Sequence, residues 1–164
     1  ERLIKDVISI ANGKSIPVGV DPKKKNFLAY KNVSLFKPNL KELKEGLGIN
    51  FKHDIIEEIL KAVDILHDKL NCRYIMTTLS ERGVLIKDYE KGIYHHIPAH
   101  LRQIADVSGA GDTVLSVAML CLVNQQDAYH IAAMSNLAGG LVCEELGAVP
   151  INKDKFAGEI KKIF

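Results

Sequence analysis

A loop at residues 106–114 constrains the fold of this chain more than any other segment. It reads Asp-Val-Ser-Gly-Ala-Gly-Asp-Thr-Val, and an apolar stretch with helical spacing follows it. Small residues let the backbone approach a ligand closely, and the first amides of a helix have no partner inside the helix. The loop therefore predicts a tight turn into a helix N-terminus, where free N–H groups and the helix dipole favour an anion such as phosphate.

The aspartate in the first turn of that helix adds chemistry to the predicted anion site. Asp112 is placed beside the anion, where it can accept a proton from an attacking hydroxyl. The structural alternative, about equally favoured by helix statistics, is that Asp106, Ser108 or Asp112 only caps the helix. Capping alone does not require the Gly-Ala-Gly spacing. The loop is neither a Walker A loop nor a Rossmann G-x-G-x-x-G fingerprint.

Strand and helix patterns alternate along the rest of the chain. We expect strands at residues 16–20, 33–36, 74–78, 84–87 and 93–97. We expect helices at residues 1–11, 27–30, 39–45, 53–70, after the 106–112 loop, at 128–145 and from 153. This order indicates an α/β fold, with a layered parallel sheet covered by helices on both faces and one antiparallel hairpin. Because the first helix begins without an initiator methionine, we expect a piece of a longer protein, truncated on its N-terminal side.

Composition excludes several function classes. The 164 residues are 47% hydrophobic and 26% charged with a net charge of +2, so no charge field recruits nucleic acid or a membrane by itself. No apolar stretch is long enough to cross a bilayer, and no signal peptide opens the chain. Cys72, Cys121 and Cys143 lack C-x-x-C spacing, so we expect reduced core thiols in a cytoplasmic protein and no zinc site.

Asn39 and Glu42 lie three residues apart at the start of an expected helix. Their side-chain oxygens share one face of the first turn, and such hard ligands suit Mg²⁺, directly or through its waters. The same spacing is also a capping box with Asn39 as N-cap, which local sequence favours. The two interpretations are compatible, because a cap can also face a ligand.

Two further loops follow expected strands, at the sheet edge where ligands of open α/β sheets bind. Residues 78–83 include Thr78, Ser80 and Gly83 and turn sharply, which predicts either part of a ligand pocket or a simple strand turn. Lys23 lies in the loop after Val20, where it either meets nucleotide phosphates or stays solvated.

A helix expected at residues 128–145 carries Asn136 and, one turn later, Gly139 and Gly140. Glycine inside a helix costs about 1 kcal/mol relative to alanine, so these two indicate that something approaches this face closely. The approaching group is either a ligand or the helix after the 106–112 loop.

The loop at residues 106–112 resembles the C-terminal signature of the ribokinase-like carbohydrate kinases, the phosphofructokinase B type, which reads roughly Asp-Thr-x-Gly-Ala-Gly-Asp. The match is complete except for Val107 in place of threonine. The resemblance implies that Asp112 is the catalytic base and that Asp106 and the Ser108 carbonyl lie beside a monovalent-cation site. It also implies an anion hole for the transferred phosphoryl group, made by Gly109, Ala110 and Gly111.

The other motifs occur in the family's order, from Asp21 to about Val149. The family ties Asn39-x-x-Glu42 to Mg²⁺ and phosphate, and it has Thr-x-Gly-x-x-Gly where this chain has Ser80 for the first glycine. The resemblance implies that the nucleotide is contacted by Thr78, Ser80, Gly83 and Asn136, and the loop position of Lys23 makes it a further candidate.

Within the family, Asp-Pro-Lys at residues 21–23, Tyr30 and Pro38-Asn39 look closest to the heptose 7-phosphate kinase domain of bifunctional ADP-heptose synthases. This implies transfer of the ATP γ-phosphoryl group to a heptose 7-phosphate on the route to lipopolysaccharide core, with Mg²⁺ and, in some members, a monovalent cation such as K⁺.

The resemblance also sets the expected domain organisation. Residues 1–164 are expected to be the C-terminal, nucleotide-binding part of a single kinase domain that lacks its sugar-binding half and lid, and the full-length protein is expected to be a homo-oligomer. A kinase of the same family for another sugar, sugar phosphate or nucleoside stays open. A nucleotide-binding module without catalysis also stays open, although binding alone does not need the base Asp112.

Overall fold

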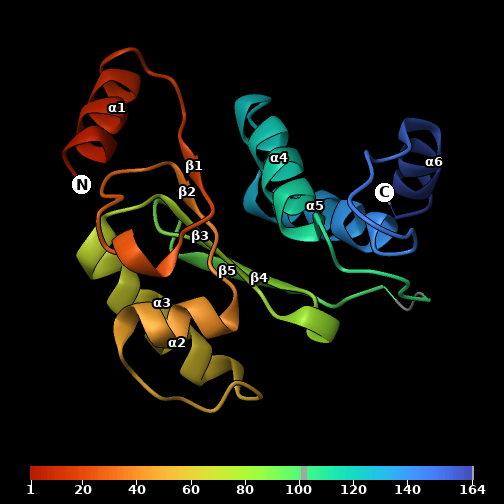
Figure 1. The fold of residues 1–164 in the computed structure, drawn as a ribbon, viewed down its shortest axis with the longest axis horizontal. Coiled ribbons are helices and arrows are strands. Elements are labelled where there is room, and N and C mark those ends of the chain that lie inside the picture. Colours follow the sequence, from red (N-terminus) through yellow and green to blue (C-terminus); the bar gives the residue numbers. More distant parts are fainter. Residues whose placement is uncertain (101–102, 164) are drawn as a thin grey trace.

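The structure is a computed structural model that describes residues 1–100 and 103–163 (Figure 1). Its strands are β1 (Gly19–Val20), β2 (Leu35–Phe36), β3 (Tyr74–Thr78), β4 (Val84–Asp88) and β5 (Ile93–Ile97). Its helices are α1 (Arg2–Gly13), α2 (Leu40–Leu47), α3 (Ile56–Leu70), α4 (Ala110–Val123), α5 (Ala128–Val142) and α6 (Lys153–Ile163), with short 3₁₀ helices η1 (Lys24–Asn26) and η2 (Ser80–Arg82).

The five strands form one sheet in the order β1-β2-β3-β4-β5. β1, β2 and β3 run parallel, and β4 and β5 continue the sheet as an antiparallel hairpin. The buried Asp88 shapes the turn of this hairpin, because its carboxylate accepts hydrogen bonds from the N–H groups of Glu90 and Lys91. The predicted parallel sheet with one antiparallel excursion is confirmed.

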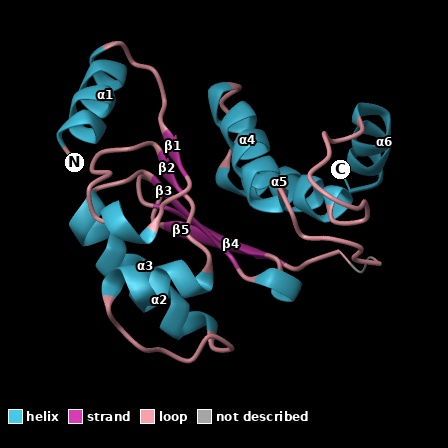
Figure 2. Cartoon of the chain, viewed as in Figure 1, coloured by secondary structure: helices cyan, strands magenta, loops and turns pink. Residues whose placement is uncertain are grey.

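Helices cover both faces of the sheet, as predicted (Figure 2). The side chains of β3 alternate between the faces, since Ile75 belongs to the core beneath α1 and α3, whereas Tyr74 and Met76 belong to the core beneath α4 and α5. The periodic apolar stripe of α3 is buried against the first face. The sheet therefore has a separate hydrophobic core on each face. Polar residues lie at the ends of its strands.

Helices α4 and α5 pack closely against each other on the second face. A Cβ added to Gly139 would lie 2.5 Å from Val114 Cγ2 of α4, so this position has no room for a larger residue. For Gly139, the helix-packing explanation is confirmed. Helix α4, and not a ligand, makes the close approach to Gly139.

Three expected elements differ clearly in the structure. The helix expected at 27–30 is replaced by the 3₁₀ helix η1 just before it, and the strands expected at residues 16–20 and 33–36 are shortened to Gly19–Val20 and Leu35–Phe36. Phe27 is 3% exposed and meets Phe36 edge to face at 5.2 Å. Phe27 is therefore apolar because it packs into the core and holds this loop there, and not because it lies on the buried face of a helix.

The cysteines are free thiols, and Cys72 and Cys121 are buried as predicted, while Cys143 is half-buried after the end of α5. Burial raises the pKa of the Cys72 thiol to about 12. Within the described residues, no helix combines the length and the apolar character needed to cross a bilayer.

Candidate active site

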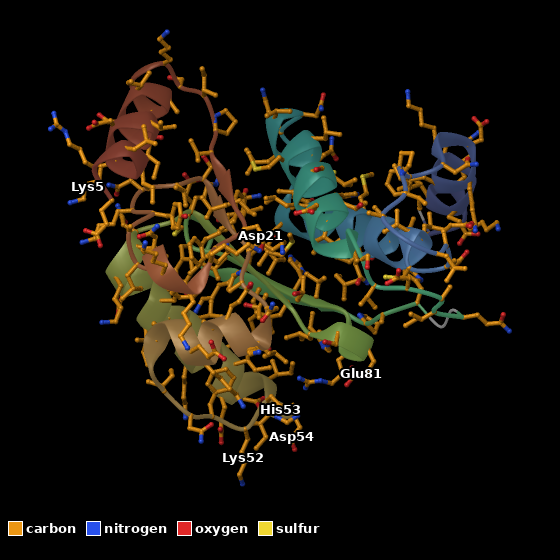
Figure 3. The ribbon with its side chains drawn as sticks, in the orientation of Figure 1. Lys5, Asp21, Lys52, His53, Asp54 and Glu81 are labelled. Carbon is orange, nitrogen blue, oxygen red and sulfur yellow. The ribbon has the colours of Figure 1, made fainter. Side chains whose placement is uncertain are left out.

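The carboxyl ends of the three parallel strands meet the N-terminal end of α4. Asp21 follows β1, Lys37 follows β2, and β3 ends at Thr78. α4 packs directly beside β1, where a Cβ on Gly19 would lie 2.4 Å from Met119 Sδ. Figure 3 marks Asp21 at this junction. Because ligands of open α/β sheets bind beyond such strand ends, we take this junction as the candidate site.

Helix α4 begins where the loop sequence predicts. Its N-cap is Gly109, whose φ of 79° is a left-handed conformation that glycine adopts without strain, and Gly111 and Asp112 lie in the first turn. An N-cap glycine has no side chain, and no side chain of the described residues caps this end. The interpretation of the loop's aspartate and serine side chains as simple helix caps is therefore wrong.

Two backbone N–H groups in the first turn of α4 are available to a ligand. The Ala110 N–H points back to the Val107 carbonyl at 3.3 Å. The N–H groups of Gly111 and Asp112 have no acceptor among the described residues. Free amides at the positive end of a 14-residue helix form the anion-binding arrangement that the sequence predicts.

The carboxylate of Asp112 is exposed in the first turn, and its backbone carbonyl accepts the Ser116 hydroxyl at 2.8 Å. A carboxylate beside an anion hole has the position that a base needs to reach a hydroxyl attacking the bound phosphoryl group.

A buried ion pair lies against the same helix end. Lys37 Nζ is 3.0 Å from Asp21 Oδ1, and the two side chains are 4% and 20% exposed. A Cβ built on Gly111 would lie 3.5 Å from Lys37 Nζ and 3.8 Å from Asp21 Oδ2. The pair thus contacts the predicted anion hole from the strand side.

Sequence reasoning missed Lys37 and assigned a phosphate contact to Lys23 instead. Lys23 is exposed at the start of η1 and, within the described residues, makes no side-chain hydrogen bond, so its nucleotide role stays a prediction. A signal for Lys37 was present in the sequence. It directly follows the last apolar residue of a strand and precedes Pro38-Asn39, at the edge where ligands bind.

Asn39 and Glu42 form the predicted capping box of α2. The Asn39 N–H donates to Glu42 Oε2 at 2.9 Å, and the Glu42 N–H donates to Asn39 Oδ1 at 2.8 Å. The Thr78 N–H donates to the Pro38 carbonyl at 3.1 Å, which attaches this cap to the end of β3. The capping interpretation is confirmed, and the role of the two residues toward Mg²⁺ stays a prediction.

The donor set at the strand ends fits a Mg²⁺ ion that arrives with a nucleotide. No three His, Cys, Asp or Glu side chains gather into a ready-made metal cluster within the described residues. Mg²⁺ usually keeps several waters and is held by one or two carboxylates plus substrate phosphates, so a complete protein cage is not required. The carboxylates of Asp21 and Glu42 supply hard oxygens of this kind.

Asp106 joins the signature loop to the segment after α5. Its Oδ1 accepts hydrogen bonds from the N–H and hydroxyl of Ser108 at 3.0 and 2.9 Å, and its Oδ2 accepts the Gly147 N–H at 3.0 Å. The backbone N–H of Ser108, then its hydroxyl and the Gly147 N–H, hold the pKa of Asp106 below its usual value. The carboxylate positions the loop, and a monovalent cation beside Asp106 and Ser108 stays a prediction.

The turn after β3 has the backbone of a glycine motif. Ser80, which replaces the family glycine, has a φ of 55°, so this serine adopts the left-handed conformation that glycine favours. Gly83 has a φ of 87°, and a Cβ there would lie 2.0 Å from the Ile97 carbonyl. Gly83 is needed for this turn, and nucleotide contacts by Thr78, Ser80 and Gly83 stay predictions.

Asn136 is 9% exposed, and its side-chain amide donates to the Pro98 carbonyl at 2.9 Å. In this structure it anchors the segment that leaves β5 onto helix α5. A contact between Asn136 and a nucleotide stays a prediction.

Known proteins resemble this chain in sequence. A family profile described as the pfkB family carbohydrate kinases matches residues 1–155. The bifunctional protein HldE of Campylobacter curvus is 35% identical over 163 residues, which are 99% of this chain and 33% of that protein. The protein of the same name from Syntrophotalea carbinolica is 33% identical over 155 residues, 94% of this chain and 31% of that protein. The chain thus spans about a third of the length of these relatives.

Solved structures show the same fold. Phosphofructokinase-2 from Escherichia coli, in complex with potassium, superposes with a TM-score of 0.86 at 20% identity, over 98% of this chain and 52% of that one. Ribokinase from Arabidopsis thaliana, complexed with ribose and ATP, superposes with a TM-score of 0.82 at 19% identity, over 98% and 52%. The chain spans about half the length of these two proteins.

Proposed function

The chain belongs to the pfkB family of carbohydrate kinases, and we propose that it provides the nucleotide side and the catalytic base of an ATP-dependent kinase that phosphorylates heptose 7-phosphate. One observation carries the proposal. The uncapped N-terminus of α4, with Asp112 in its first turn, lies against the Asp21–Lys37 pair at the strand ends. The 33–35% identity to bifunctional HldE proteins supports the choice of a heptose phosphate as acceptor.

In the proposed reaction, the sugar hydroxyl attacks the γ-phosphorus of ATP and loses its proton to the carboxylate of Asp112, while the bond from the γ-phosphorus to the β,γ-bridging oxygen breaks and ADP leaves. The N–H groups of Gly111 and Asp112, with the loop backbone at Gly109 and Ala110, hold the negative charge of the transferred group. Asn39 and Glu42 would hold Mg²⁺, which would supply positive charge to neutralise the nucleotide phosphates. Asp106 keeps the loop in place through Gly147, and a K⁺-type cation beside Asp106 and Ser108 would stabilise the same loop.

We also propose that residues 1–164 are the C-terminal part of one kinase domain, because the chain spans about half of the solved kinases. In that arrangement Lys23, Thr78, Ser80, Gly83 and Asn136 line the nucleotide side. The homo-oligomer expected for the full-length protein stays a prediction.

The test is an assay of the complete gene product with ATP, Mg²⁺ and one acceptor at a time, following ADP release. We expect heptose 7-phosphate to be preferred over ribose, fructose 6-phosphate and ketodeoxygluconate. Preference for another acceptor would replace the heptose assignment and keep the kinase. Nucleotide binding without turnover on any acceptor would favour a binding module.

A separate measurement tests the domain proposal. The isolated 164-residue chain should bind ADP weakly and phosphorylate no sugar, because phosphoryl transfer depends on positioning and on exclusion of water by the rest of the domain. Turnover comparable to that of the complete gene product would show that the acceptor site lies within these residues.

A further inference from the structure

Lys37 is the only lysine in the buried class among the described residues, with 3% of its surface exposed. It lies between the fully buried Phe36 and the buried Pro38 at the carboxyl end of β2. An ammonium group loses its hydration when it is buried, so a lysine is rarely found there unless it is paired.

The pairing of this ammonium is incomplete. Nζ carries three N–H donors, and Asp21 Oδ1 at 3.0 Å is its one hydrogen-bond acceptor among the described residues. Replacing a buried ion pair by apolar residues of similar size is often neutral or stabilising, so stability alone does not explain why this pair is present.

The surroundings make the position of Lys37 still less favourable for the protein alone. Its Nζ would be 3.5 Å from a Cβ on Gly111, in the first turn of α4. The N-terminal end of a helix carries a partial positive charge, so a cation at that end is repelled. Among the described residues, Asp21 is the one carboxylate paired with this ammonium, and the carboxylate of Asp112 in the first turn of α4 makes no ion pair with it. An additional anion between the ammonium and the helix end would satisfy both.

We propose that Lys37 is a phosphate-binding residue of this active site, whose remaining N–H donors contact the phosphoryl group held by the amides of α4. Asp21 holds the ammonium in position. The inference rests on the proposed kinase function and deepens it, because it names a cation of the protein that stabilises the transferred group in addition to Mg²⁺. The residues that form this contact, Lys37, Asp21 and Gly111, are all described in the structure.

The test uses the complete gene product and a planar mimic of the transferred group, ADP with aluminium fluoride and Mg²⁺. Lys37→Met should weaken binding of this complex about 100-fold, the typical loss for one donor to a transition-state charge, and weaken ADP alone far less. Lys37→Arg should restore part of the affinity. Lys87→Met is the matched control, since Lys87 also pairs with an aspartate, Asp64, but on α3. Equal loss for ADP and for the mimic would overturn the proposal.

A second measurement does not depend on kinase activity. Without metal, inorganic phosphate should raise the melting temperature of the wild type, and Lys37→Met should abolish this rise. Asp21→Asn should keep the rise or increase it, because the amide oxygen of asparagine can still accept the Lys37 N–H while a negative charge beside the anion is removed. If Asp21→Asn abolishes the rise as Lys37→Met does, the phosphate response depends on the intact ion pair and not on the donors of Lys37, and the proposal fails. The proposal also fails if the wild type shows no rise.

The double variant Asp21→Asn, Lys37→Met separates binding from folding. Removing both partners should leave the melting temperature without ligand at or above that of the wild type, while the phosphate response is lost. A large drop in melting temperature would show that the pair serves the fold. Absence of sugar-dependent turnover together with a Lys37-dependent phosphate response would reject the proposed function and keep the anion site.

Discussion

Two lysine–aspartate pairs in this molecule have the same chemistry and different surroundings. Asp21–Lys37 joins the ends of β1 and β2 next to the N-terminus of α4, while Asp64–Lys87 joins α3 to β4. In the second pair the Asp64 side chain is 48% exposed, and its Oδ1 also accepts the Tyr89 hydroxyl at 2.7 Å. The first pair is more deeply buried and has fewer partners.

The second pair belongs to a cluster of side chains that contact one another and are partly open to water. The His67 ring stacks on the Tyr89 ring with centroids 3.5 Å apart, and its Nδ1 is 2.9 Å from the Cys72 carbonyl. Burial raises the pKa of the Asp64 carboxyl, but hydrogen bonds from Lys87 and Tyr89 outweigh it and hold the pKa below the usual value. Such a cluster fastens a helix to the sheet.

The burial of unused donors, more than the presence of charge, separates a ligand site from a structural contact, because the Lys87 side chain is 19% exposed to water and the Lys37 side chain is 4% exposed. Buried donors without acceptors are costly to the protein alone and become favourable when a ligand supplies the acceptor. The ends of β1 and β2 meet that condition, and the contact between α3 and β4 does not.

The largest expected effect is on kcat, and it should differ between the α4 end and the Asp64–Lys87 cluster. Asp112→Asn should lower kcat by about three orders of magnitude or more with little change in ATP affinity, because a base acts only in the transition state. Asp64→Asn, the matched change in the other region, should leave kcat within about twofold. Steady-state kinetics on the complete gene product measures both. Activity of Asp112→Asn close to the wild type would remove the catalytic assignment.

A smaller effect is expected at the capping box. Glu42→Gln keeps an oxygen that can accept the Asn39 N–H but loses the charge, so the Mg²⁺ concentration for half-maximal rate should rise several-fold at nearly unchanged stability. A Mg²⁺ titration of the rate, with a thermal melt as control, checks this. If the titration is unchanged, Glu42 serves only as a cap.

The hydroxyl of Tyr89 should matter for stability and not for turnover. Tyr89→Phe removes one hydrogen bond to the Asp64 carboxylate, which costs about 1 kcal/mol of the free energy of unfolding. Denaturant unfolding measures the loss, and kcat should not change. A fall in kcat at unchanged stability would mean that this cluster also serves the reaction.

The smallest effect depends on pH. The pKa of Asp64 is lower in the folded protein than in the unfolded chain, so its contribution is fully present above the unfolded pKa of about 3.9 and is lost as pH falls through the folded value. Lys87→Met should therefore cost less than about 1 kcal/mol at pH 7, because solvent screens the pair, and approach no cost at lower pH. Unfolding of both proteins at pH 7 and in acid gives the comparison. A cost that grows on acidification would contradict this explanation.

Most of the fold followed from patterns within short segments. Strands and helices were predicted close to their observed bounds, since the period of the apolar residues reports which face is buried. Where the prediction was wrong, as at residues 27–30, an apolar residue marked a contact with a distant partner. Phe27 packs on Phe36, which no local pattern announces.

The candidate site likewise contains features that depend on local sequence and features that depend on contacts between distant segments. The sequence alone determined the turn at Gly109, the first-turn position of Asp112 and the capping box of Asn39 and Glu42, because each depends on residues a few positions apart. Only the tertiary structure decided that Lys37 is buried against Gly111, that Asp106 holds Gly147 and that Asn136 holds Pro98. These contacts join segments far apart in the chain, and they exist only because the strand order brings the strand ends and the α4 N-terminus to one edge of the sheet.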